Sequence, residues 1–281
     1  MFSTEQKVKK ESDYYIYTAS SQATKAYFYP IVLGNFIYEP GYAILRSSYD
    51  SYLLFYVRSG NCTIDFNGQI YQVHEGQIVF LNCYLPHGYK TTDGYEALWL
   101  HFDGTLASTY YDMIIGIGSP VIDIRDTYQF TKNLQKLYET FRDKKPYKEA
   151  LFNNWIVNIL TELLVSKDTD RTDTISTDLS DELINYMNEH LSEELTLEML
   201  AAKVSLSPFY FTRLFKKETG FTPHEYVITA RINAAKYLLK TTDHSIKEIC
   251  FQTGFQNESS FCTTFKKRTG NTPTAYRNQI T

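Results

Sequence analysis

The sequence predicts an α+β multidomain protein. We expect an N-terminal antiparallel β-barrel, helices at the end of it, and then an all-α domain with two helix-turn-helix motifs. Residues 31–103 alternate short apolar segments with turn residues, as in a small barrel or jelly roll. Residues 126–165 carry apolar side chains at helical spacing. Residues 215–226 return as residues 265–276, and a repeat at fixed offset indicates a duplicated supersecondary unit.

Residues 1–125 supply the strands of the predicted barrel. Residues 1–27 are polar at first and then rich in tyrosine, and we expect them to form an arm. Residues 52–57 are a continuous apolar run of strand length, and Asn67 with Gly68 is the dipeptide most typical of a type I′ hairpin turn. Several such segments in succession predict an antiparallel sheet that closes on itself.

Residues 126–165 contain two apolar stripes. One runs from Phe130 to Phe141, and after a break at Pro146 a second runs from Phe152 to Leu164. Two interpretations are open, because such stripes either pack against the barrel or form a dimer interface between two copies of the chain. We favour the dimer interface.

Each copy of the repeat has the signals of a helix, a turn and a second helix. In the first copy, Ser207 is a good N-cap, Pro208 suits the first helical position, and Gly220 ends the second helix. In the second copy, Ser245 and Glu248 form a capping box, Gly254 lies in the turn, and Asn257 caps the second helix. Both copies therefore predict complete helix-turn-helix units.

A single long helix separates the two units. Thr222 and Glu225 form a capping box at its start, and apolar residues continue at helical spacing to Leu239. This helix has no counterpart in the repeat, so we interpret it as a rigid spacer.

Charge is unevenly distributed along the chain. Residues 196–281 hold 12 of the 28 Lys and Arg but only 6 of the 32 Asp and Glu, which leaves 16 against 26 for the remainder. A basic segment on an acidic protein is typical of nucleic-acid binding.

Composition excludes several classes of protein. Hydrophobic residues make up 43% of the 281 residues, which is ample for two packed domains. No apolar run approaches 18 residues, and the first residues lack the pattern of a signal peptide. The four cysteines are scattered, as expected in a reducing compartment. We therefore expect a cytoplasmic protein with no membrane partner.

Residues 196–277 resemble the DNA-binding region of the AraC/XylS family of bacterial transcription regulators. The resemblance rests on residues 206–208, 214–220, 231–239, 249, 254–255 and 265–270, with Pro273 and Tyr276. The pattern of Gly60, Gly76 and residues 86–89 is similar to the cupin-like sensor domain attached to many of these regulators. These resemblances imply a cupin-like effector-binding domain at 1–125, a helical dimerisation segment at 126–165, a linker at 166–178 and a DNA-binding domain at 179–281.

The predicted barrel has candidate residues for a carbohydrate site. Sugars are bound by polar groups that meet their hydroxyls and by aromatic faces that meet the apolar side of the ring. Suitable residues stand at strand ends, and the family resemblance adds weight to Arg46, His87 and Trp99. The candidates are Arg46, His87, Tyr89, Trp99 and His101.

No metal, cofactor or catalytic site is predicted. Cupin enzymes hold a metal with clustered histidines, whereas His74, His87 and His101 are spread along this chain. The sequence also lacks a nucleophile elbow, a phosphate loop and a dinucleotide fingerprint.

The family resemblance implies which residues meet DNA. In the first unit Arg213 would bind guanine through two hydrogen bonds. In the second unit Thr263 stands where family members often have Arg, which predicts weaker or different readout there, with Glu258 accepting from cytosine. The lysines that follow would meet phosphates or solvent. The full set is Ser207, Phe209, Thr212, Arg213, Lys216, Lys217, Asn257, Glu258, Ser259, Thr263, Lys266 and Lys267.

Taken together, these features predict a ligand-responsive, sequence-specific DNA-binding regulator that activates genes for sugar or oligosaccharide use. Its partners would be double-stranded DNA, a small carbohydrate effector, a second copy of the chain and RNA polymerase. Two alternatives remain open. One is a metal-dependent cupin enzyme fused to a DNA-binding module, and the other is a regulator that needs no ligand.

Overall fold

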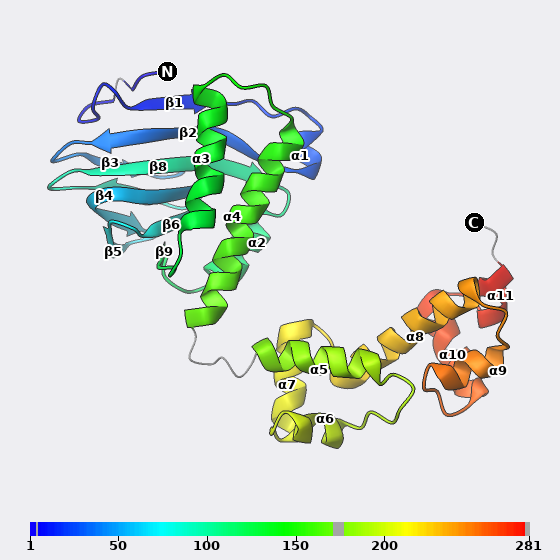
Figure 1. Ribbon diagram of the computed structural model, residues 1–281. Coiled ribbons are helices and arrows are strands. Elements are labelled where there is room, and N and C mark those ends of the chain that lie inside the picture. The colour runs from blue at the N-terminus through cyan, green and yellow to red at the C-terminus, as the bar shows by residue number, and fades with distance from the viewer. Residues whose placement is uncertain (4, 171–176, 279–281) are drawn as a thin grey trace. The chain divides into compact units, whose positions relative to one another are not determined.

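The computed structural model describes residues 1–3, 5–170 and 177–278. The chain divides into two compact units, Met1–Arg171 and Thr172–Thr281 (Figure 1). Among the described residues, the first unit contains antiparallel strands and four helices, and the second is all helical. The strands of the first unit are β1 (Asp13–Ile16), β2 (Phe28–Tyr38), β3 (Ala43–Arg46), β4 (Tyr52–Phe66), β5 (Gln69–His74), β6 (Ile78–Asn82), β7 (His87–Lys90), β8 (Tyr95–Gly104) and β9 (Val121–Ile122).

Strand β4 belongs to two layers. Its first half pairs with β6 and β8, and its second half pairs with β5 and β7. The change of partners follows a register shift between Val57 and Ser59, beside Gly60 at a φ of 78°. A bulge at such a point bends a strand and increases its twist. The larger layer has the order β1-β2-β8-β4-β6-β9, and β3 lies beyond β7 in the smaller one.

The antiparallel α+β class is therefore confirmed, but the described strands do not close into the expected barrel. A closed barrel needs the first and last strands of the sheet to pair with each other. Here β1 and β9 are the two ends of the larger layer, with four and two residues. The predicted Asn67-Gly68 turn is present between β4 and β5, with φ values of 50° and 78°.

Both faces of the larger layer are buried. Along β4, Leu53, Phe55 and Val57 point into a core shared with the smaller layer, whereas Tyr52 and Leu54 point into a second core under the helices. This arrangement explains why residues 52–57 are continuously apolar, since a strand covered on both sides has no solvated face. The helices of this unit are α1 (Ala23–Ala26), α2 (Ala107–Ile114), α3 (Tyr128–Arg142) and α4 (Glu149–Asp170).

Helices α3 and α4 lie across one face of the sheet (Figure 1). The two predicted apolar stripes are on these helices, and most of their residues are fully buried against the strands. The structure thus supports the packing interpretation for the stripes. A dimer interface on this segment would need the outer face of the helices, where Tyr128, Leu151 and Val165 are exposed.

Helices extend into the predicted linker from both sides. Helix α4 continues to Asp170 and α5 begins at Thr177, so residues of the 166–178 segment belong to helices at both ends. Extending a helix already nucleated by an apolar stripe adds one hydrogen bond per residue, and polar side chains do not prevent it. Residues 171–176 lie outside the described part of the chain.

The second unit has two small cores joined by one helix. Its first core contains residues of α5 to α8, and its second contains residues of α8 to α11. Val227 at the start of α8 belongs to the first core, and Ile232, Ala235 and Leu239 belong to the second. The helices are α5 (Thr177–Glu189), α6 (Leu197–Lys203), α7 (Pro208–Thr219), α8 (Pro223–Thr241), α9 (Ile246–Gln252), α10 (Glu258–Thr269) and α11 (Pro273–Asn278).

The predicted helix ends of this unit are confirmed. Thr222 with Glu225 and Ser245 with Glu248 form complete capping boxes at α8 and α9. Ser207 and Asn257 cap α7 and α10, and Gly220 ends α7 in the left-handed conformation. Both helix-turn-helix units and the spacer helix are thus present.

Arg231 on α8 joins the two halves of this unit. Its Nε donates to the carbonyl of Leu191 at 3.0 Å, and its Nη2 donates to the carbonyl of Glu193 at 2.7 Å. Its guanidinium also lies over the ring of Phe255, at 6.0 Å from the centroid. Gly254, in the turn of the second motif, packs so closely that a Cβ there would overlap the Leu191 carbonyl and lie 2.8 Å from Arg231 Nε.

The close approach at Gly254 predicts a large cost for any side chain. Gly254→Ala should lower the free energy of unfolding by roughly 2–4 kcal/mol, because the methyl group overlaps its neighbours and the φ of 82° strains an L-residue. Gly270→Ala is the matched control, since Gly270 has the same φ but a Cβ built there would meet no atom within 4 Å. That change should cost only about 1–2 kcal/mol. Chemical denaturation would measure both, and equal losses would contradict the packing described for Gly254.

Candidate functional site

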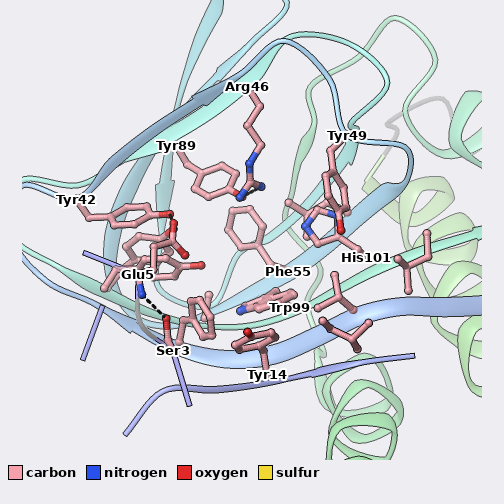
Figure 2. A pocket seen from close by; sticks show the side chains of 18 residues that line it. Ser3, Glu5, Tyr14, Tyr42, Arg46, Tyr49, Phe55, Tyr89, Trp99 and His101 are labelled. Atoms are coloured by element: carbon pink, nitrogen blue, oxygen red, sulfur yellow. Dashed lines mark hydrogen bonds between the residues drawn. The ribbon is translucent and has the colours of Figure 1, made fainter. Parts of the chain in front are cut away.

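A cavity of about 370 Å³ opens on the core face of the larger sheet in the first unit (Figure 2). Its wall comes from the N-terminal segment, β1 to β4, β7 and β8, and most of the side chains are aromatic or aliphatic. The residues are Ser3, Glu5, Tyr14, Ile16, Ile31, Val32, Phe36, Tyr38, Tyr42, Arg46, Tyr49, Leu53, Phe55, Tyr89, Tyr95, Ala97, Trp99 and His101.

Four of the five residues predicted to bind an effector stand in this wall, namely Arg46, Tyr89, Trp99 and His101. The fifth does not. His87 is buried beneath the turn before β7, with its Nδ1 at 2.8 Å from the carbonyl oxygen of Leu85. Burial lowers the pKa of this imidazole. Because side chains alternate along a strand, His87 and Tyr89 are on the same face of β7. The separation of two residues nevertheless leaves His87 outside the cavity wall.

Most of the aromatic wall was not predicted from the sequence. A usable signal was present in β8, where Tyr95, Ala97, Trp99 and His101 line the cavity at a period of two, as expected of one face of a strand. A similar alternation in β2 brings in Phe36 and Tyr38, which lie on the same face. Tyr14 carried no local signal, because it reaches the cavity only through the pairing of β1 with β2.

Arg46 extends from the end of β3 into the cavity (Figure 2). Its Nη1 donates to the hydroxyl of Tyr89 at 3.1 Å, and its guanidinium lies over the ring of Tyr49 at 5.7 Å from the centroid. The side chain forms no ion pair within 4.0 Å among the described residues. Burial also raises the pKa of the Tyr89 phenol to about 12, so this hydroxyl stays protonated at neutral pH.

Trp99 lies opposite Gly34 in the pairing of β8 with β2. A Cβ on Gly34 would stand 2.8 Å from the indole ring, so the glycine provides the space that the tryptophan occupies. The indole Nε1 is buried and has no hydrogen-bond partner within the described part of the chain. A buried N–H without an acceptor costs free energy, and a ligand oxygen would offset that cost.

His101 is held as a neutral imidazole at one end of the cavity. Its Nδ1 lies 2.8 Å from the hydroxyl of Ser51, and its ring meets the ring of Tyr49 edge to face. Burial, with a smaller contribution from Arg46, lowers the pKa of His101 to about 3. A neutral imidazole carries one donor and one acceptor, and it adds no charge to the cavity.

The N-terminal residues, predicted to be an arm, fold along one side of the cavity. Val8 and Asp13 to Ile16 pair with β2, and Glu5 accepts a hydrogen bond from the Tyr42 hydroxyl at 2.7 Å. Along β1 the side chains alternate. Tyr14 and Ile16 line the cavity, whereas Tyr15 packs among the residues beneath α3 and α4.

No three His, Cys, Asp or Glu side chains come together in a group that could hold a metal ion, among the residues that the structure describes.

None of the helices in the described ranges is long and apolar enough to cross a membrane.

The predicted DNA-reading residues are on α7 and α10, the second helix of each motif. On α7, Phe209 is 81% exposed, and Arg213 is exposed one turn further on, with its guanidinium 5.9 Å from the centroid of the Tyr210 ring. On α10, Glu258 and Thr263 are exposed. The remaining exposed candidates are Ser259, Lys216, Lys217, Lys266 and Lys267.

Three of the predicted DNA-reading residues already have local partners. Ser207 and Asn257 accept hydrogen bonds from the backbone N–H groups of Tyr210 and Ser260 as N-caps. Thr212 is half-buried, and its hydroxyl donates to the carbonyl of Pro208 at 2.8 Å. These groups are therefore less available for base edges than Arg213.

Two family models match this chain, one in each unit. Residues 200–279 match a helix-turn-helix domain, and residues 30–152 match an AraC-like ligand binding domain. The chain is 26% identical over 248 residues to the HTH-type transcriptional activator RhaS of Salmonella schwarzengrund, covering 81% of this chain and 85% of that protein. It is 42% identical over 97 residues to the regulatory protein PocR of Salmonella typhimurium, covering 34% of this chain.

Some relatives are much longer than the matched region. The chain spans 32% of PocR and 18% of YtdP, a transcriptional regulator of Bacillus subtilis that is 32% identical over 143 residues. Among solved structures, an AraC-type regulator from Chromobacterium violaceum is 31% identical, with a TM-score of 0.35, over 37% of this chain and 93% of that one. A ligand-binding domain followed by a double helix-turn-helix domain defines a transcription regulator. The chain belongs to the AraC family.

The geometry of α7 and α10 predicts unequal contributions to DNA recognition. Arg213→Ala should weaken binding by ~1–3 kcal/mol and remove the preference at one base position, because a bidentate Arg–guanine pair discriminates by that amount. Thr263→Ala should cost less than ~1 kcal/mol, since Thr offers one hydrogen bond or a methyl contact.

Titrating both variants against a selected DNA site changed one base at a time would measure these effects. A uniform loss over all sequences for Arg213→Ala would instead mean that this residue binds a phosphate.

Proposed function

We propose that this chain is a ligand-responsive, sequence-specific DNA-binding regulator that activates genes for sugar or oligosaccharide use. The observation that carries this proposal is the cavity, in which aromatic faces surround a few polar groups, in the same chain as two exposed recognition helices. The name of the RhaS relative, a transcriptional activator, is consistent with activation.

A carbohydrate suits the cavity in size and in chemistry. Its volume of about 370 Å³ lies at the small end of the range for small-molecule sites, roughly 300–1,000 Å³. Phe55 and Trp99 present aromatic surface to the apolar side of a sugar ring, while Arg46, His101 and several tyrosine hydroxyls can meet its hydroxyl groups (Figure 2).

Double-stranded DNA is the partner of the second unit in this proposal. Recognition helices α7 and α10 would enter successive major grooves, with Arg213 and Phe209 reading bases in the first and Glu258, Ser259 and Thr263 in the second. Capping by Ser207 and Asn257 fixes where each recognition helix begins. The exposed lysines that follow would neutralise phosphates.

We expect a cytoplasmic homodimer that uses the outer face of the 126–165 segment and contacts RNA polymerase. We propose no catalytic role for the chain.

The proposal predicts that a saccharide stabilises the first unit through Trp99. In a melting assay with a panel of mono- and oligosaccharides, a binder present at 100 times its Kd should raise stability by about 2.7 kcal/mol. Trp99→Ala should abolish that shift, while DNA affinity without a saccharide stays unchanged. Met113→Ala, at an exposed position of α2 outside the cavity, is the control and should retain the shift.

Two results would count against this function. One is a panel in which no saccharide alters either the melting temperature or DNA binding. The other is a stabilising saccharide whose effect is the same in the Trp99 and Met113 variants, which would place its site elsewhere.

A further inference from the structure

Two side chains of the cavity wall, Arg46 and Trp99, have N–H groups without an acceptor among the described residues. Arg46 is the one Lys or Arg among the lining residues, and of its five N–H groups a single one has a partner in the described chain, the Tyr89 hydroxyl. Because the Tyr89 oxygen accepts that hydrogen bond, its own proton is available to a ligand. The buried Nε1–H of Trp99 is a further donor without an acceptor.

The described wall contains a single carboxylate. This carboxylate is Glu5, and it accepts from the Tyr42 hydroxyl at 2.7 Å. Glu5 is exposed and forms no ion pair with Arg46 within 4.0 Å. In Figure 2 the Glu5 side chain lies beside Tyr42, while the guanidinium of Arg46 points between Tyr49 and Tyr89. Arg46 therefore has no ion-pair partner within 4.0 Å among the described residues, and the carboxylate of Glu5 acts on it only from farther away.

A half-buried guanidinium without a close ion-pair partner is stabilised by a ligand that supplies the opposite charge. Removing a cation from water is offset only by an anion with good geometry or by several hydrogen bonds. The planar guanidinium matches a carboxylate through two parallel hydrogen bonds, which is the strongest arrangement that a side chain offers. His101, held neutral by burial, does not compete with Arg46 for the ligand charge.

We propose that the effector is an acidic carbohydrate, whose carboxylate binds Arg46 and whose ring lies against Phe55 and Trp99. This inference rests on the proposed function, because it takes the cavity to be the effector site. It narrows the ligand from carbohydrates in general to those that bear a carboxylate, such as uronic acids and their short oligomers.

The test compares acidic saccharides with their neutral counterparts on the full chain. Calorimetric titration at neutral pH and constant ionic strength would use glucuronate, galacturonate and digalacturonate against glucose, galactose and galactobiose. At least one acidic probe should bind roughly 10- to 100-fold more tightly than its neutral counterpart, as expected for hydrogen bonds to a charged group.

Substitutions separate the charge of Arg46 from other effects. Arg46→Gln should remove the preference for the acidic probe, and Arg46→Lys should keep part of it, because the charge remains but the two parallel hydrogen bonds are lost. Lys90→Gln is the matched control, since it removes the same charge from an exposed residue of β7 outside the cavity wall. Its preference should stay unchanged. Melting curves without ligand would establish that each variant is folded.

The outcomes distinguish this inference from the proposed function. If neutral saccharides bind as tightly as acidic ones and Trp99→Ala weakens both, the cavity is the effector site but the inference is wrong. A preference that persists in both Arg46 variants would also overturn it. If no saccharide of either set binds, the carbohydrate proposal fails and the inference fails with it.

Discussion

The first unit depends on a single strand that serves two layers. Strand β4 pairs with β6 and β8 before its bulge and with β5 and β7 after it. Because its side chains alternate between two cores, the same six residues, 52–57, hold the helices on one face and enclose the cavity on the other. The space for a ligand therefore results from the bend in β4, since a flat strand would have continued one sheet instead of opening a second layer.

The second unit is constrained by Arg231 and Gly254. The helix-turn-helix motifs have separate cores, so packing within each motif does not fix their relation to each other. The hydrogen bonds from Arg231 to the carbonyls of Leu191 and Glu193, with its contact to Phe255, connect the loop before the first motif to the turn of the second. Glycine at position 254 is what allows that turn to approach so closely.

Local features of the fold could be predicted from the sequence, whereas features that join distant segments could not. The capping box of Thr222 with Glu225 and the Asn67-Gly68 turn each depend on neighbouring residues, and both are present. The placement of Arg46 and Trp99 in one cavity was anticipated because both stand on strands, but Tyr14 was missed because β1 must first pair with β2. The open sheet was missed for the same reason, since closure depends on which strands meet at its ends. His87 shows that a strand position alone does not determine which side chains reach a cavity.

Strand β1 is anchored on both of its faces. On the side away from the cavity, Asp13 accepts hydrogen bonds from the hydroxyls of Tyr15 and Tyr138, at 2.7 and 2.6 Å, and Tyr17 donates to Glu149 at the start of α4. On the cavity side, Tyr14 and Ile16 alternate with these residues along the same backbone. A rotation of the strand that repositions Tyr14 must also displace the phenol rings that contact α3 and α4. Residues 13–17 thus link the cavity side of the sheet to the helices on its other face.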